Sequence, residues 1–211
     1  MTGVEDSRRP LASRNSAWAP ALASRIARTP VTPNMISVVA VVFALIGSAA
    51  MARAPIHPWL LLVGAATMQL RLLCNLLDGM VAVEGGKASA TGALYNEVPD
   101  RIADALFLVS FGYAVGLPWL GFVAAILAVG TAYLRAFGAA LGLGHDFSGP
   151  MAKQQRMAAL TGGGLLGFVE LLVNGTLVSA QLVLALVVAG TAWTCVRRTL
   201  RMAARLKGRP S

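Results

Sequence analysis

The chain of 211 residues is 56% hydrophobic and only 13% charged. Soluble domains carry about 25% charged residues, so this composition excludes an ordinary soluble domain and indicates that lipid surrounds much of the surface. The formal charge of +9 comes mainly from Lys and Arg residues that precede the first apolar run or follow the last one. Charge in those places is typical of membrane proteins and attracts anionic headgroups. We therefore expect membrane lipids, and no nucleic acid, as partners.

Six apolar runs predict an all-α integral membrane protein with six transmembrane helices. Most of them approach the roughly 20 residues that a bilayer-crossing helix needs. Proline and glycine at the breaks, as in Leu117-Pro118 and Asn174-Gly175, are residues that turns favour. The expected spans are residues 35–52, 58–83, 92–117, 119–141, 157–175 and 177–196.

A shorter pattern precedes the first span. Trp18, Leu22 and Ile26 recur every fourth residue, which predicts an N-terminal amphipathic helix that lies on the membrane interface. A disordered basic segment is the alternative. Residues 1–14 are expected to form a flexible basic tail, and residues 15–211 a single membrane-embedded domain.

The distribution of Lys and Arg predicts the orientation of the chain. Fifteen of the 18 lie in the tails or in the connections between the second and third and between the fourth and fifth spans. The connections on the opposite side hold only Arg53. Since positive residues accumulate on the cytoplasmic side, we expect a protein of the cell (inner) membrane with both termini in the cytoplasm. Two termini on one side require an even number of spans, which six satisfies.

Polar residues form a stripe on each of two consecutive spans. The second span ends with one face that carries Asn75, Asp78, Gly79 and Ala82, and the third opens with Gly92, Asn96, Asp100 and Asp104 one turn apart. A short connection makes these helices antiparallel neighbours, so the stripes are expected to face each other. Converging carboxylate and amide oxygens suit Mg²⁺, Mn²⁺ or Ca²⁺. The structural alternative is hydrogen bonding by Asn between helices, with Asp paired to Arg71 or Arg135.

These stripes resemble the signature of the CDP-alcohol phosphotransferase family, which reads Asp-x-x-Asp-Gly-x-x-Ala-Arg, a spacer, and Gly-x-x-x-Asp-x-x-x-Asp. The spacing is kept throughout. The family's first and third aspartates are Asn75 and Asn96 in this chain, and its arginine is Val83. Residues 32–34, Thr-Pro-Asn, also resemble the family. The chain is thus identified as a divergent member.

The resemblance implies an enzyme of phospholipid biosynthesis. Such an enzyme transfers a phosphoalcohol group, here expected to be phosphatidyl, from a CDP-activated donor such as CDP-diacylglycerol to an acceptor alcohol and releases CMP. It implies a divalent metal, Mg²⁺ or Mn²⁺, and a homodimer. Carried over by position, the metal ligands are Asn75, Asp78, Asn96 and Asp100, and Asp100 and Asp78 are the catalytic carboxylates. Gly79, Ala82 and Gly92 would line the cytidine pocket, and Arg135, Lys153 and Arg156 would bind substrate phosphate.

Several alternatives remain open at this point. The two asparagines also fit a catalytically degenerate relative that binds nucleotide or lipid without turnover. Asp104 is either an additional carboxylate of the site or the partner of Arg135. Lys153 and Arg156 could instead be only positive residues that accumulate on the cytoplasmic side of the membrane, without binding substrate. Residues 163 and 167, both glycine, permit close helix approach either inside the protein or at a dimer interface.

Overall fold

In the computed structural model, which describes residues 18–208, seven helices and no strand are present. The expected flexible tail at residues 1–14 lies outside the described part of the chain. The helices are α2 (Trp18–Ala27), α3 (Pro33–Ala52), α4 (Leu60–Val83), α5 (Gly92–Ala114), α6 (Pro118–Ala140), α7 (Lys153–Asn174) and α8 (Val178–Lys207). The all-α class predicted from the apolar runs is confirmed.

Five of these helices, α3, α4, α6, α7 and α8, are long and apolar enough to cross a membrane. The fold is thus that of a multi-pass membrane protein. The helix predicted as the third span, α5, has 23 residues but carries Glu97, Asp100, Arg101 and Asp104 in its first 13 residues. Composition alone therefore does not mark α5 as a span.

The helix boundaries differ from the expected spans at three places. Helix α5 ends at Ala114 and not at residue 117, because Gly116 adopts a left-handed φ of +76° and Pro118 then starts α6. Helix α7 starts at Lys153, one turn before the apolar run. Helix α8 continues past residue 196 to Lys207, because its Arg and Lys residues favour helix although they end the apolar pattern.

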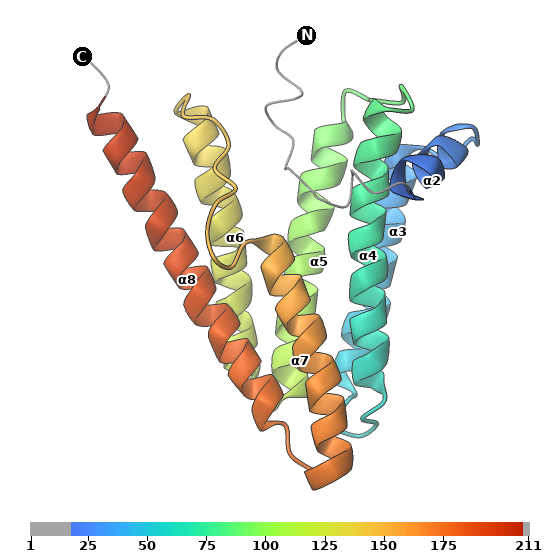
Figure 1. The fold of residues 1–211 in the computed structure, drawn as a ribbon, viewed down its shortest axis with the longest axis vertical. Coiled ribbons are helices and arrows are strands. Elements are labelled where there is room, and N and C mark those ends of the chain that lie inside the picture. Colours follow the sequence, from blue (N-terminus) through green and yellow to red (C-terminus); the bar gives the residue numbers. More distant parts are fainter. Residues whose placement is uncertain (1–17, 209–211) are drawn as a thin grey trace.

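The six long helices form a ring in which each packs mainly on two others. Helix α4 packs mainly on α3 and α7, whereas α5 packs on α3 and α6, and α8 packs on α6 and α7. Figure 1 shows α8 diverging from α4, with α7 between them and α2 crossing the end of the bundle that also holds the end of α8. The main core lies where α4, α5 and α7 meet, around Leu61, Phe107, Phe111 and Leu160.

Residues 18–27 are helical, so the alternative of a disordered segment is wrong there. Helix α2 buries Ala19 and Ala23 in a cluster with Met80 and Val81 of α4, while Trp18 stays half exposed. Leu22 and Ile26 of the predicted stripe pack on the same cluster, so the contact with the bundle is made by the small residues and by part of that stripe.

The glycines of α7 pack inside the protein. A Cβ atom at Gly163 would lie 2.9 Å from a methyl group of Val183, and one at Gly167 would lie 3.0 Å from Ala180 on the same neighbouring helix. Both contacts are between α7 and α8. Of the two alternatives for this pair, internal packing is the one that the structure supports.

Candidate active site

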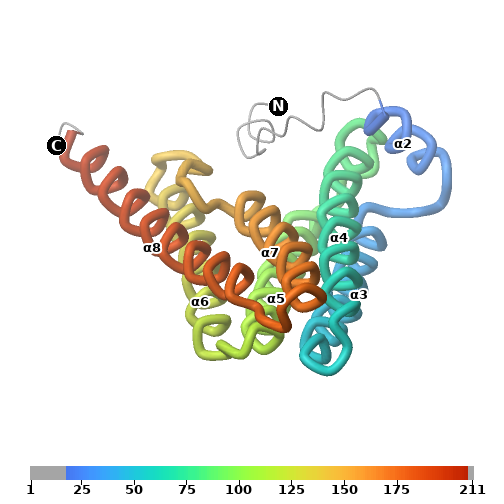
Figure 2. Tube along the Cα trace, turned by 60° about the horizontal axis from the view of Figure 1, so that its bottom comes forward, coloured from blue at the N-terminus to red at the C-terminus, as the bar shows by residue number. Residues whose placement is uncertain are grey.

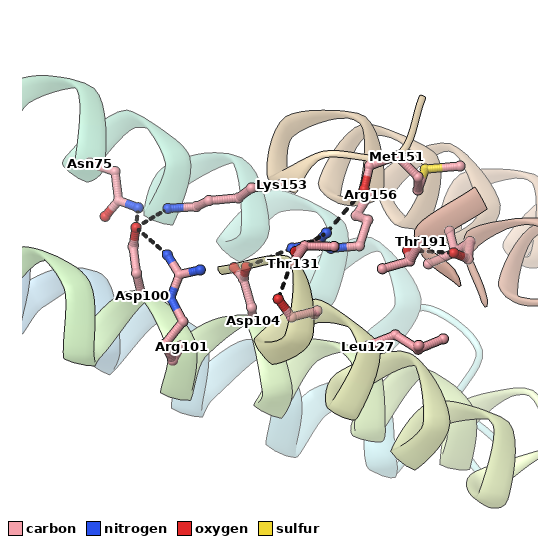
Figure 3. Close-up of polar contacts among 12 residues, drawn as sticks. Asn75, Asp100, Arg101, Asp104, Leu127, Thr131, Met151, Lys153, Arg156 and Thr191 are labelled. Atoms are coloured by element: carbon pink, nitrogen blue, oxygen red, sulfur yellow. Dashed lines mark hydrogen bonds and ion pairs between the residues drawn. The ribbon is translucent and has the colours of Figure 1, made fainter. Parts of the chain in front are cut away.

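Helices α4, α5 and α7 bring their polar residues together near the start of α7. On α4, Arg71, Asn75 and Asp78 follow one another at a spacing of four and three residues and so share a face. On α5, Asp100 and Asp104 lie one turn apart. Figure 3 shows how Asn75 and Lys153 converge on Asp100. The two predicted stripes therefore meet, although α4 and α5 pack mainly on other helices and are bridged here by side chains.

Asp100 lies at the centre of this cluster and is buried. Its Oδ1 accepts hydrogen bonds from Arg71 Nη2 at 2.9 Å and from Asn75 Nδ2 at 2.5 Å. Its Oδ2 accepts a hydrogen bond from Lys153 Nζ and lies 3.5 Å from Arg101 Nη2. Both carboxylate oxygens are thus held by positively charged side chains.

Asp104 is more deeply buried, with 2% of its surface exposed. Its carboxylate pairs with Arg71 Nη2 at 2.9 Å and with Arg156 Nη2 at 3.4 Å. The alternative that Asp104 pairs with Arg135 is wrong. Arg135 instead bonds Glu97 at 2.5 Å, and its guanidinium lies 5.3 Å from the centroid of the Phe147 ring.

Arg156 is 1% exposed and fixes three elements to each other. Besides Asp104 of α5, it donates to Met151 O in the connection before α7 and to Thr131 Oγ1 of α6 at 3.3 Å. Its burial and these bonds indicate a structural contribution. The prediction that Arg156 contacts substrate stays a prediction.

Asp78 has a different environment from the other two aspartates. It is 4% exposed, and its Oδ2 accepts a hydrogen bond from Ser37 Oγ of α3 at 2.7 Å. Its Oδ1 is buried, and among the described residues only the adjacent Gly79 amide is placed to bond it. No cation is paired with this carboxylate within residues 18–208.

The remaining predicted site residues lie at the edge of this cluster. Asn96 is exposed, one turn before Asp100, and makes no hydrogen bond or ion pair with any residue between 18 and 208. Gly79, Ala82 and Gly92 are half buried. At Gly92 an added Cβ would meet only Ser89 Oγ, at 3.4 Å, so this position is open.

Three side chains of the cluster were not among the predicted site residues, namely Ser37, Arg71 and Arg101. Ser37 is a polar residue inside the first apolar run, and polar residues inside spans are a general signal of function. Arg71 precedes Asn75 by one turn, and the pairing of aspartate with Arg71 that the structural alternative proposed is confirmed for Asp100 and Asp104.

The donor set has one carboxylate oxygen available for a metal. No three His, Cys, Asp or Glu side chains within the described range form a group that could hold an ion. Asp78 Oδ1 is buried without a cation, and Asn75 directs its Nδ2 to Asp100, so its amide oxygen is left for a ligand. Mg²⁺ is commonly bound by one or two carboxylates together with water and substrate phosphates. The residues therefore fit a hard divalent ion at Asp78.

An apolar groove of about 420 Å³ lies beside the start of α5. It is lined by Asn34, Met35, Val38, Val39 and Tyr95. The groove lies between the start of α3 and the first turn of α5.

Asp146 supports the connection between α6 and α7. Its Oδ1 accepts a hydrogen bond from the Ser148 amide at 2.8 Å. Burial alone would raise the pKa of Asp146, but the hydrogen bonds from Ser148 and the charges of Arg198 and Arg201 hold that pKa below its ordinary value. His145 is exposed.

Two curated relatives are similar in sequence. The archaetidylinositol phosphate synthase of Aeropyrum pernix is 32% identical over 147 residues, which is 67% of this chain and 71% of that protein. The bifunctional IPC transferase and DIPP synthase of Rubrobacter xylanophilus is 31% identical over 161 residues. That match covers 72% of this chain but only 36% of the Rubrobacter protein, so the chain spans about a third of the latter.

The fold is similar to that of a solved enzyme. The Mycobacterium tuberculosis phosphatidylinositol phosphate synthase with CDP-DAG bound matches with a TM-score of 0.71 and 19% identity, over 89% of this chain and 94% of that one. The same enzyme in complex with manganese and citrate gives a TM-score of 0.73 over 87% and 88% of the chains. No family model matches the sequence. The extent and identity of the Aeropyrum match, together with this fold, show that the chain belongs to the CDP-alcohol phosphotransferase family.

Proposed function

We propose that this protein transfers a phosphoalcohol group, phosphatidyl in view of its apolar groove, from a CDP-activated donor to an acceptor alcohol in phospholipid biosynthesis. The observation that carries the proposal is that motif residues of α4 and α5 come together, since Asn75 bonds Asp100 and the charges of the buried Asp78 and Asp100 act on each other. A family motif that merely survived as helix packing would not leave Asp78 buried with an oxygen that no cation neutralises.

The reaction is a displacement at phosphorus. The acceptor hydroxyl oxygen forms a bond to the phosphorus that carries the donor alcohol, and the bond from that phosphorus to the bridging oxygen breaks. CMP leaves with the electron pair. Asp100, which bonds Arg71 and Lys153, is the proposed acceptor of the hydroxyl proton.

Substrate contacts are proposed at the edge of the cluster. Gly79, Ala82 and Gly92 would line the cytidine pocket, because small residues let the nucleotide approach the helix backbone. Arg135 and Lys153 would bind phosphate, and both are only partly buried, with side chains 17% and 13% exposed. The groove beside Tyr95 suits an acyl chain of a diacylglycerol donor, since its lining is mainly apolar.

A divalent ion, Mg²⁺ or Mn²⁺, is the proposed cofactor. Asp78 and Asn75 would hold it. In the family motif, the metal ligands also include the positions of Asn96 and Asp100. A bound ion would neutralise the donor pyrophosphate and stabilise the charge that develops on it. Support comes from the uncompensated oxygen of Asp78 and from the solved family enzyme that was crystallised with manganese.

The arrangement in the membrane is proposed as six spans in one domain, residues 15–211, with α2 on the interface. Helix α5, third in chain order, would bring the number of spans from five to six. Its charged residues are mostly paired inside the protein, and Phe107 and Phe111 are in the core. Both termini would face the cytoplasm of the cell (inner) membrane. In a cysteine-free background, externally added maleimide should label Arg53→Cys but not Lys207→Cys, and equal labelling would contradict this orientation.

A homodimer is also proposed, from the family resemblance. Crosslinking in native membranes should trap a species of twice the monomer mass. A monomer at every crosslinker concentration would contradict this proposal.

A second candidate is binding of nucleotide or lipid without turnover. The observation that favours it is the contact of both Asp100 oxygens with Arg71, Lys153 and Arg101, because these contacts occupy the oxygens that would accept the proton of an acceptor hydroxyl.

One assay separates the two candidates. Purified protein in detergent is incubated with CDP-diacylglycerol, Mg²⁺ or Mn²⁺, and a panel of myo-inositol phosphate, myo-inositol, glycerol 3-phosphate and serine. The transferase releases CMP only with its acceptor, and the panel identifies that acceptor. CDP-diacylglycerol binding without CMP release for any acceptor would leave the second candidate.

A further inference from the structure

The coordination of Asp100 leaves little room for a metal ion. Arg71 Nη2, at 2.9 Å, and Asn75 Nδ2, at 2.5 Å, already bond Oδ1. Lys153 Nζ bonds Oδ2, and Arg101 lies 3.5 Å from the same oxygen. A divalent ion could bind Asp100 only next to these cations, and like charges on one carboxylate repel each other strongly in a buried site.

The connection between α6 and α7 determines where Lys153 lies. In Figure 1 the connection after α6 turns back along the bundle, so that α7 starts well below the ends of α6 and α8. Gly149 makes the turn with a φ of +132°, and a Cβ there would lie 2.3 Å from Thr194 of α8. The Met151 amide also bonds Thr194 Oγ1 at 3.1 Å. These contacts fix the segment just before α7 against α8, and from there the Lys153 side chain reaches Asp100 of α5.

The first turn of α7 supplies a cation to each aspartate of α5. Lys153 reaches Asp100, and Arg156, three residues later, reaches Asp104 (Figure 3). With Arg71, Arg101 and Arg135, five cations stand against the four carboxylates of Asp78, Glu97, Asp100 and Asp104. The cluster therefore carries excess positive charge before any metal binds, and one divalent ion already exceeds what the remaining carboxylate neutralises.

We propose that Lys153 takes the place of a divalent cation at Asp100, so that the site binds a single ion, held by Asp78 and Asn75. The inference rests on the proposed function. The replacement of two family aspartates by Asn75 and Asn96 is its counterpart in the sequence, because a site that uses a protein ammonium in place of an ion needs fewer carboxylates. Lys153 then supplies fixed positive charge to the donor pyrophosphate from the side of α7.

The test counts bound metal, with no substrate turnover involved. Full-length protein in detergent is titrated with Mn²⁺, and free Mn²⁺ is followed by electron paramagnetic resonance. The wild type should bind one Mn²⁺ per chain. Lys153→Gln should bind a second, weaker Mn²⁺, and Lys153→Gln/Asn96→Asp should bind two, with the spectral broadening of two neighbouring ions.

Two matched variants keep the result interpretable. Lys153→Arg retains the charge and should bind one Mn²⁺. Gln154→Ala changes the exposed neighbour of Lys153 and should also bind one. Two Mn²⁺ per wild-type chain would overturn the inference. So would a single Mn²⁺ in both variants that lack Lys153, provided size-exclusion chromatography shows that either one is folded and monodisperse.

The inference and the proposed function fail in different ways. One Mn²⁺ in the wild type and two in the Lys153→Gln variants, without CMP release, would support the inference and contradict the proposed transferase activity. CMP release with no Mn²⁺ bound to any variant would support the transferase and overturn the inference together with the metal site.

Discussion

The two halves of the candidate site contain carboxylates in opposite electrostatic environments. In the α4 half, Asp78 bonds the neutral hydroxyl of Ser37 and leaves a buried oxygen without a cation. In the α5 half, Asp100 and Asp104 are surrounded by cations from α4, α5 and α7. Figure 2 shows α7 beside α4 and in front of α5, and the side chains of Lys153 and Arg156 in its first turn reach the aspartates of α5. A buried pair contributes structure, whereas an unpaired buried charge is retained for a ligand.

The largest effect should come from the α4 half. Asp78→Asn removes the uncompensated charge and should lower CMP release by at least about 100-fold, because the proposed metal loses its only free carboxylate. Its melting temperature in detergent should not fall, since no cation loses a partner. Asp100→Asn should lower CMP release similarly and also lower the melting temperature, because Lys153 is left unpaired. Near-normal CMP release in either variant would retire the site assignment.

The next effect concerns folding in the α5 half. Asp104→Leu leaves Arg156 buried without its carboxylate and should destabilise the protein by about 3–5 kcal/mol. The measurement is unfolding in detergent. The matched control is Asp104→Leu/Arg156→Leu, which removes the whole pair and should recover much of that loss, since Arg71 still has Asp100. Equal destabilisation by the single and double variants would show that charge pairing is not the cause.

A smaller effect should separate the two asparagines. Asn75→Leu deletes an amide that bonds Asp100 and is proposed to face the metal, and it should weaken Mn²⁺ binding by at least about tenfold. Asn96→Leu, at an exposed position without a bond to the cluster, should weaken it less. Asn75→Asp restores the family's carboxylate and should keep Mn²⁺ binding. Calorimetric titration with CDP-diacylglycerol present measures all three. Indifference to Asn75→Leu would remove this residue from the ligand set.

The sequence predicted the family, the α4 stripe and the meeting of α4 with α5, because helical spacing and a fixed motif depend only on local geometry. The contact of Lys153 with Asp100 could not be predicted, because it joins residues 53 positions apart through an irregular connection. Hydropathy likewise missed the polar first turn of α7 and the basic last turns of α8, since it reports burial in lipid and says nothing of helix propensity. Asp104 was assigned a wrong alternative partner because two arginines lie within spans and spacing cannot rank them.

The smallest effect on stability should come from the ion pair of Glu97 and Arg135. This pair lies at the surface, so it can be compared with the buried pair of Asp104 and Arg156. Half of the Glu97 carboxylate is exposed, so Glu97→Gln should change the free energy of unfolding by no more than about 1 kcal/mol, against the several expected for Asp104. The cation–π contact of Arg135 with Phe147 persists in this variant and holds the guanidinium near the site.

If Arg135 binds substrate phosphate, releasing it from Glu97 should lower KM or leave it unchanged. Arg135→Gln should raise KM with kcat nearly constant, because binding is lost equally in the ground and transition states. A fall in kcat alone would instead place Arg135 in the transition state.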